Sequence, residues 1–294
     1  MNKPLVSITS AFYNEQDKIL DMVRSIVAQT FSDWELILLN DGSTDKSLEL
    51  VKSINDPRIR VFSNGANRGR AASLNYLTKL AKGKYIARMD ADDICSTERI
   101  KKQVELIESK TDIDLVGTGL CYLDKYDNPI GHVYAKPNHP QITSNPERTF
   151  GIAHGSLLGK RCWFEKNPYN EKYALAIDFN LFLRTYHNSI FANVPEPLYY
   201  YRLDQSFSIK QQFVARNASA KFLFQYFVNN REYIKALKST STQYCKFIAT
   251  LILIAMGKRK NIMQRRFTAL TPNEVDRYRN EIDIIKNTPI SIKE

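Results

Sequence analysis

Short apolar runs alternate with amphipathic segments along the first 120 residues, and this alternation limits the possible folds more than any other feature of the chain. The runs of strand length lie at 5–10, 34–39, 59–62, 85–89 and 115–120, and the first of them is rich in β-branched residues. Helical spacing or helix-boundary residues mark 15–29, 44–54, 70–81 and 97–109. This order predicts an α/β fold with a mostly parallel sheet flanked by helices. Such sheets bind ligands beyond the carboxyl ends of their strands, so we expect the chemistry in the loops there.

The chain from 121 to 205 follows a less regular pattern. Residues 121–150 are predicted to form a connecting segment with a hairpin near Asp127. A helix is expected at 175–186 and a strand at 198–202. We interpret residues 1–205 as one domain.

The region 206–294 is predicted to be helical. Its spacing is helical from 210 to about 257, and the run of Ser and Thr at 239–242 predicts a break. Thr271 followed by Pro272 is a helix-start signal for the last segment.

The positive charge of the chain is concentrated in this helical region. Between residues 205 and 266 there are twelve Lys or Arg and one acid, which accounts for the whole net charge of +11. A solvated helix face, an anionic membrane surface and nucleic acid are the three environments that such a segment fits. No helix-turn-helix, zinc-finger or RNP pattern is present, so nucleic acid is not expected.

An apolar run at 247–256 favours a membrane surface among these alternatives. It is ten residues long, whereas a membrane span needs about 20, so we expect the chain to lie on a membrane and not to cross it. The same face would alternatively be buried in a homodimer. The N-terminus has no signal-peptide core and the four cysteines are far apart, so we expect a cytoplasmic protein that is peripheral on the inner face of the plasma membrane.

Four loop segments carry the polar residues that follow the predicted strands. They are Ala-Phe-Tyr-Asn-Glu at 11–15, Asn-Asp-Gly-Ser-Thr-Asp at 40–45, the segment 67–75, and Met-Asp-Ala-Asp-Asp at 89–93. Three acids in four positions repel one another unless a cation lies close by. Asp90 and Asp92 can converge on one Mg²⁺ or Mn²⁺ that bridges to a diphosphate, or the loop can instead pair with Arg88 or Arg99.

Together and in this order, the four segments resemble glycosyltransferase family 2 on the GT-A fold, over about residues 4–205. The resemblance implies an inverting, metal-dependent transferase of the hexosyltransferase type, which moves one sugar from a UDP-sugar to a saccharide acceptor. It divides the domain into a nucleotide-binding half at 1–120 and an acceptor-side half at 121–205. A polyprenyl-diphosphate-linked acceptor in bacterial surface-polysaccharide synthesis (O-antigen or capsule) fits the basic region at 206–294.

The resemblance assigns the base pocket of the donor site to the first three segments. The backbone of Ala11, where the family usually has Pro, and the side chain of Tyr13 would line this pocket. Asp41 would accept a hydrogen bond from the uracil ring, and Asn67 would lie near the base. Glu15 stands one position before the place of the family's usual acid.

The phosphate and metal roles fall to the third and fourth segments. Arg70 would lie near the phosphates, Asp90 would hold the ribose and assist the metal, and Asp92 would bind Mn²⁺ or Mg²⁺. The metal would neutralise the departing nucleoside diphosphate.

Three further residues are candidates on the acceptor side. Asp178, in the family-like segment 177–184, is assigned as the general base, although an Asp at a helix start can equally be an N-cap. His154 resembles a residue that faces the acceptor or the metal, and a purely structural His is the alternative. Arg202 would contact the diphosphate, and Asp204 stands where the family usually has His.

Two other functions stay open at this point. A nucleotidyltransferase would use a similar sheet, but with a Gly-rich loop and a Lys or Arg after the first strand, where this chain has Ala-Phe-Tyr-Asn. A catalytically inactive membrane-binding scaffold would explain the basic region. It would have no need for Asp41, Asp90, Asp92 and Asp178 together.

Overall fold

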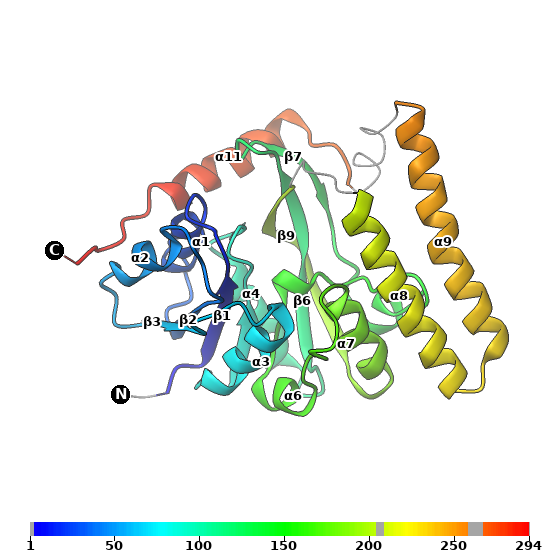
Figure 1. Ribbon diagram of the computed structural model, residues 1–294. Coiled ribbons are helices and arrows are strands. Elements are labelled where there is room, and N and C mark those ends of the chain that lie inside the picture. Colours follow the sequence, from blue (N-terminus) through cyan, green and yellow to red (C-terminus); the bar gives the residue numbers. More distant parts are fainter. Residues whose placement is uncertain (1–2, 204–208, 258–266, 294) are drawn as a thin grey trace.

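The computed structural model describes residues 3–203, 209–257 and 267–293, and its centre is a curled sheet with helices on both faces (Figure 1). The first half of this sheet is parallel, in the order β3-β2-β1-β4. Its elements and the helices that follow them are β1 (Val6–Phe12), α1 (Ile19–Val27), β2 (Trp34–Asn40), α2 (Ser47–Lys52), β3 (Ile59–Ser63), α3 (Arg70–Leu80), β4 (Tyr85–Arg88) and α4 (Arg99–Ser109). The predicted alternation of strands and helices is confirmed.

The second half of the sheet is mixed, because β8 (Leu158–Lys160) lies antiparallel between β4 and β6 (Leu115–Leu123). β9 (Phe191–Arg202) runs parallel to β6, and the short strands β5 (Ile94–Cys95) and β7 (Pro129–Val133) complete the sheet. The hairpin predicted near Asp127 is confirmed, with β6 and β7 as its arms. The sequence does not reveal β8, which has three residues, or the first half of β9, where prolines interrupt the pattern.

Each face of the sheet has its own hydrophobic core. Leu36 and Leu38 of β2 pack with α1, α2 and α4, whereas Ile37 and Leu39 pack with α3, α6 (Arg161–Lys166), α7 (Ile177–Thr185) and the first helix of the C-terminal region. Because both faces are covered, this strand is apolar without alternation, as is typical of parallel sheets. The short elements α5 (His139–Ile142), η1 (His154–Ser156) and η2 (Tyr186–Asn188) lie in the connections.

Two long helices, α8 (Ile209–Asn229) and α9 (Tyr233–Ala255), form a hairpin beside the sheet domain (Figure 1). The break predicted at 239–242 is wrong, since α9 continues through it and the chain turns at 230–232, where Arg231 has a φ of 61°. The hydroxyls of Ser241 and Thr242 donate to backbone carbonyls four residues earlier, so these side chains are satisfied within the helix.

The last helix, α11 (Pro272–Lys286), returns to the sheet and begins at the predicted Thr271, which forms a capping box with Glu274. Its buried face, formed by Tyr278, Ile282 and Ile285, packs against β5, β6 and β9. Among the helices in the described ranges, none is long and apolar enough to span a membrane.

Candidate active site

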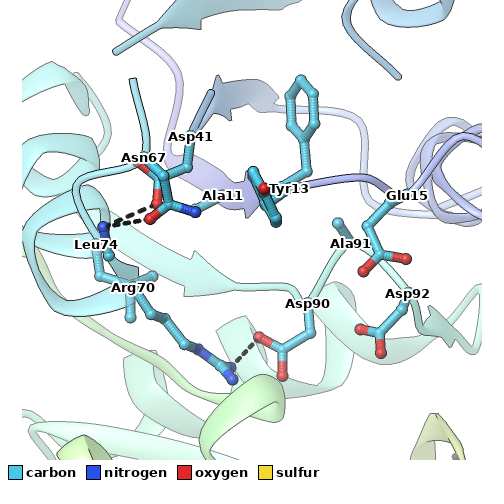
Figure 2. A pocket seen from close by; sticks show the side chains of 12 residues that line it. Ala11, Tyr13, Glu15, Asp41, Asn67, Arg70, Leu74, Asp90, Ala91 and Asp92 are labelled. Atoms are coloured by element: carbon cyan, nitrogen blue, oxygen red, sulfur yellow. Dashed lines mark hydrogen bonds and ion pairs between the residues drawn. The ribbon is translucent and has the colours of Figure 1, made fainter. Parts of the chain in front are cut away.

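A cavity of about 330 Å³ opens at the carboxyl ends of β1, β2 and β4 (Figure 2). All eight residues that the sequence assigned to the donor site line it. They are Ala11, Tyr13, Glu15, Asp41, Asn67, Arg70, Asp90 and Asp92. Four further residues line the cavity and were not predicted, namely Phe12, Gly69, Leu74 and Ala91. The only sequence signal for them is that they lie in or beside the motif segments.

Asp41 organises the loop that forms one wall of this cavity. Its carboxylate is buried and accepts hydrogen bonds from Asn64 Nδ2 at 2.7 Å and from the backbone amides of Arg68 and Gly69 at 2.9 and 3.1 Å. A carboxylate has about four acceptor positions, so three bonds within the protein leave about one for a ligand. Gly42 allows the same loop to pack closely against it, because a Cβ at this position would lie 2.5 Å from the backbone nitrogen of Asn67.

An ion pair between Arg70 and Asp90 forms one wall of the cavity, with 2.5 Å between Nη2 and Oδ1. Asp90 raises the pKa of the Arg70 guanidinium. Burial is the largest single effect on Asp90 and opposes its ionisation, but Arg70 and smaller contributions from other nearby groups together hold the pKa of this carboxyl below its usual value. Both groups are therefore charged at neutral pH.

The backbone around Asp90 is fixed by strand β9. The amide of Asp90 donates to Tyr199 Oη at 3.2 Å, and the Tyr199 hydroxyl donates to Asp93 Oδ2 at 2.8 Å. Gly155 packs under this arrangement, where a Cβ would lie 2.5 Å from Tyr199 Oη and 3.0 Å from Asp90 Oδ2. The position of Asp90 thus depends on close contact with two distant segments of the chain.

Asp92 and Glu15 bring two carboxylates close together on the other side of the cavity (Figure 2). Within the described part of the chain, no other residue donates a hydrogen bond to either carboxylate. Burial and the charge of Asp90 raise the pKa of Asp92. Burial and the charge of Asp92 raise the pKa of Glu15 to about 7, against the opposing effect of Lys18.

This donor set fits a divalent cation. Unpaired carboxylate oxygens suit Mg²⁺ or Mn²⁺, and a cation between them would relieve their repulsion. In the residues that the structure describes, no group of three His, Cys, Asp or Glu side chains converges on one point. A cation here would therefore depend mainly on water and on substrate phosphates for its remaining ligands.

A second cavity, of about 270 Å³, lies on the other side of the Arg70–Asp90 pair, and both of these residues line it as well. Asp178 lies in its wall, in the first turn of α7. The N-cap of α7 is Ala176, in a left-handed conformation with a φ of 55°, so Asp178 is not the N-cap. No donor among the described residues binds its carboxylate, which remains available to a ligand.

His154 also lines the second cavity, and its Nε2 lies 2.8 Å from the Tyr169 hydroxyl. Burial and the neighbouring Arg70 lower the pKa of His154 to about 4. The ring is therefore neutral at physiological pH and can donate or accept one hydrogen bond, but it carries no charge.

Arg202 lies in neither of these two cavities, in contrast to the predicted diphosphate contact. Its side chain is buried and forms a bidentate ion pair with Asp127, at 2.6 and 2.9 Å. It also donates to the backbone carbonyl of Asp92 at 3.0 Å and to Asp21 at 3.2 Å. The Arg202 guanidinium thus binds other residues of the protein and does not face either cavity. Asp204 lies outside the described residues.

Comparison with known sequences identifies the class. A family model described as "Glycosyl transferase family 2" matches residues 7–191. An uncharacterized glycosyltransferase of Methanocaldococcus jannaschii is 34% identical over 211 residues, which cover 69% of this chain and 72% of that protein. The UDP-Glc:alpha-D-GlcNAc-diphosphoundecaprenol beta-1,3-glucosyltransferase of Escherichia coli is 39% identical over 106 residues, covering 36% of this chain and 42% of that protein.

Solved structures with the same architecture include S. aureus TarS 1-349 in complex with UDP-GlcNAc, with a TM-score of 0.64, 17% identity, and coverage of 97% of this chain and 81% of that one. A mannosyltransferase from Pyrobaculum calidifontis in complex with GDP-Man and Mn2+ has a TM-score of 0.59, 14% identity, and coverage of 97% and 86%. The fold is thus that of GT-A glycosyltransferases. Given the family match, the chain belongs to glycosyltransferase family 2.

In the metal-free protein, we expect ionisation of Glu15 to lower the free energy of unfolding as the pH rises. The variant Glu15→Gln should not show this decrease. The pKa of Glu15 is about 7 in the folded chain, against an ordinary value of 4.5. The native state therefore binds more protons between these values, and the free energy of unfolding falls as the pH rises from 4.5 through about 7.

Urea unfolding at about pH 4 and about pH 8 measures this difference. The variant should be more stable than the wild type at the higher pH only. The exposed Glu49→Gln serves as the control, and an equal pH dependence for Glu15→Gln and the wild type would contradict the raised pKa of Glu15.

Proposed function

We propose that this glycosyltransferase transfers one sugar, with inversion, from a UDP-sugar to a saccharide acceptor, and that a divalent cation assists the reaction. The observation that carries the proposal is the pair of cavities that share Arg70 and Asp90. One cavity contains the proposed donor residues, and the other contains Asp178. A sugar carbon placed at this boundary would be open to attack from the side opposite the nucleotide, which inversion requires.

In the donor cavity, the proposed role of Tyr13 and the Ala11 backbone is to line the base pocket, and Asp41 holds the loop that carries Asn67. Asp90 accepts from the ribose, and Arg70 places a positive charge beside the diphosphate. Asp92, with Asp90 nearby, would hold Mn²⁺ or Mg²⁺, and a cation there supplies positive charge that stabilises the leaving diphosphate. Because Glu15 lies beside Asp92, it adds negative charge to the same place.

In the acceptor cavity, Asp178 is the proposed general base. The acceptor hydroxyl gives its proton to the Asp178 carboxylate while its oxygen forms a bond to the anomeric carbon. The bond from that carbon to the β-phosphate oxygen breaks, and its electron pair stays on the departing UDP. Neutral His154 orients the acceptor through a hydrogen bond, with its ring held by Tyr169.

Release of UDP from a panel of UDP-sugars, with Mn²⁺ and again with EDTA, tests the donor and the metal together. We expect slow hydrolysis of one UDP-sugar in the presence of the cation and its loss on chelation. Release of pyrophosphate from a nucleoside triphosphate with a sugar phosphate would instead identify a nucleotidyltransferase. Absence of UDP binding in calorimetry would contradict the proposal.

Asp178→Asn keeps the size of the side chain and removes the proposed proton acceptor. We expect turnover to fall by about 10²–10⁴-fold, because general bases contribute on this scale, with UDP affinity unchanged. Asp112→Asn, at an exposed position away from both cavities, is the matched control. Full turnover in Asp178→Asn would exclude it as the base.

The acceptor that we propose is linked to polyprenyl diphosphate and is presented at the cytoplasmic face of the plasma membrane, in surface-polysaccharide synthesis. The E. coli relative is named for a diphosphoundecaprenol acceptor, which supports this choice. In this proposal residues 1–205 form the catalytic domain, and the basic region within 206–294 brings it to the anionic lipid.

The outer face of α9 supports the membrane contact. Apolar side chains are exposed along one stripe of this helix, at Ile234, Leu237, Ile248 and Ile252, and the stripe continues at the C-cap residue Met256. Three lysines lie on the same helix and no acid occurs in it, so the surface combines apolar area with positive charge. The basic residues at 258–260, 265 and 266 lie outside the described residues.

Sedimentation with vesicles tests this contact. We expect the protein to bind phosphatidylglycerol–phosphatidylethanolamine vesicles more strongly than phosphatidylcholine vesicles, and the double variant Leu237→Ser with Ile248→Ser to lose most of the binding. Ile284→Ser, an exposed apolar position on α11, is the control. A dimer in light scattering that this double variant dissociates, without vesicle binding, would show that the stripe is a subunit interface.

A further inference from the structure

We propose that the C-terminal helix α11 is a strap that positions the acidic loop 90–93, and that Lys286, Asp127 and Arg202 are positioning residues for it. The proposal rests on the proposed function in one respect, namely that this loop binds the cation and the ribose. In Figure 1, α11 runs across the molecule from β7 to α1, and α1 is the helix that follows the cavity-lining segment 11–15 along the chain. Two separate sets of contacts connect it to the loop.

The first set runs through Arg202. Lys286, near the end of α11, forms an ion pair with Asp127 at the turn of the β6–β7 hairpin. Asp127 in turn holds the Arg202 guanidinium through two bonds, and Arg202 Nη1 donates to the carbonyl of Asp92 at 3.0 Å. The backbone amide of Arg202 also donates to Asp93 Oδ1 at 2.8 Å. The loop is thus held at two consecutive residues by one buried arginine.

The second set holds the chain just after the loop. Glu281 of α11 accepts from Ser96 Oγ at 2.6 Å and from the Thr97 amide at 3.0 Å, and its other oxygen accepts from the Tyr200 hydroxyl. Ser96 and Thr97 follow β5, and Tyr200 lies two residues before Arg202 on β9. One helix therefore fixes both the acidic loop and the strand that supports it.

The charges favour a positioning role over general stabilisation. A guanidinium that is buried loses its hydration, so a buried ion pair is a weak source of stability. Its bidentate geometry nevertheless fixes where the partner backbone lies. Through this geometry Arg202 holds the backbone carbonyl of Asp92, the residue whose side chain is the proposed cation ligand. Loss of a group that hydrogen-bonds to a metal-ligating residue typically lowers the affinity for the metal.

Lys286→Met tests the strap with a side chain of similar length, at a position that is about one third exposed. We expect the Mn²⁺ affinity of the UDP complex, measured by calorimetry at saturating UDP, to fall by about 10-fold, the lower end of the range for direct partners of a ligand, because Lys286 acts through Asp127 and Arg202. UDP affinity without the cation should change less, because Arg70 and Tyr199 hold Asp90 independently of α11. Lys286→Arg should retain the wild-type value, and Arg279→Met, which removes an exposed ion pair of the same helix, is the control.

Hydrogen exchange at the amides of 90–97 supplies a readout that needs neither metal nor nucleotide. We expect faster exchange there in Lys286→Met and in Asp127→Asn, with the parallel strands β1 and β2 unaffected. Unchanged exchange in both folded variants would overturn the strap, whatever the nucleotide results. A wild-type protein that binds neither UDP nor Mn²⁺ would contradict the proposed function, while the exchange data would still decide the positioning.

Discussion

The structure around the site depends on how the chain accommodates the carboxylates at the end of β4. Asp90, Asp92 and Asp93 fall within four residues, and like charges in a partly buried place repel one another strongly. Arg70 forms an ion pair with Asp90. The carboxylate of Asp93 is buried and accepts hydrogen bonds from the Tyr199 hydroxyl and the Arg202 amide. Among the described residues Asp92 forms no ion pair with a basic side chain, and it lies beside Glu15. The surrounding elements thus bind two of the three carboxylates, one by an ion pair and one by hydrogen bonds, and Asp92 is the one proposed to hold a cation.

The Arg70–Asp90 pair has a second consequence, since it forms the common wall of two cavities. Residues from the parallel half of the sheet line one of them, and α7 and η1 contribute to the other. A donor and an acceptor placed in these cavities would meet at that wall. The proposed division of labour between the halves of the domain therefore follows from where a single ion pair lies.

The C-terminal region has two parts with different surroundings. The hairpin of α8 and α9 exposes apolar and basic side chains, whereas α11 returns to the sheet and is buried along one face. Glu281 of α11 binds the segment that follows the acidic loop, and Lys286 pairs with Asp127, which holds Arg202. The sequence predicts a contact of this region with a membrane or a second subunit, and the proposed role of α11 adds support of the acidic loop.

The sequence alone determined the parallel half of the sheet and the residues that gather at its carboxyl edge. Strand–helix alternation is a local pattern, and parallel strands bring the loops that follow them to the same edge whatever the rest of the chain does. Only the tertiary structure decided that β8 lies between β4 and β6, that α9 passes through its Ser–Thr run, and that Arg202 is used within the protein. It also decided that Glu281 meets Ser96, 185 residues earlier in the chain. Such partners are set by packing between distant segments, and no local spacing of residues encodes them.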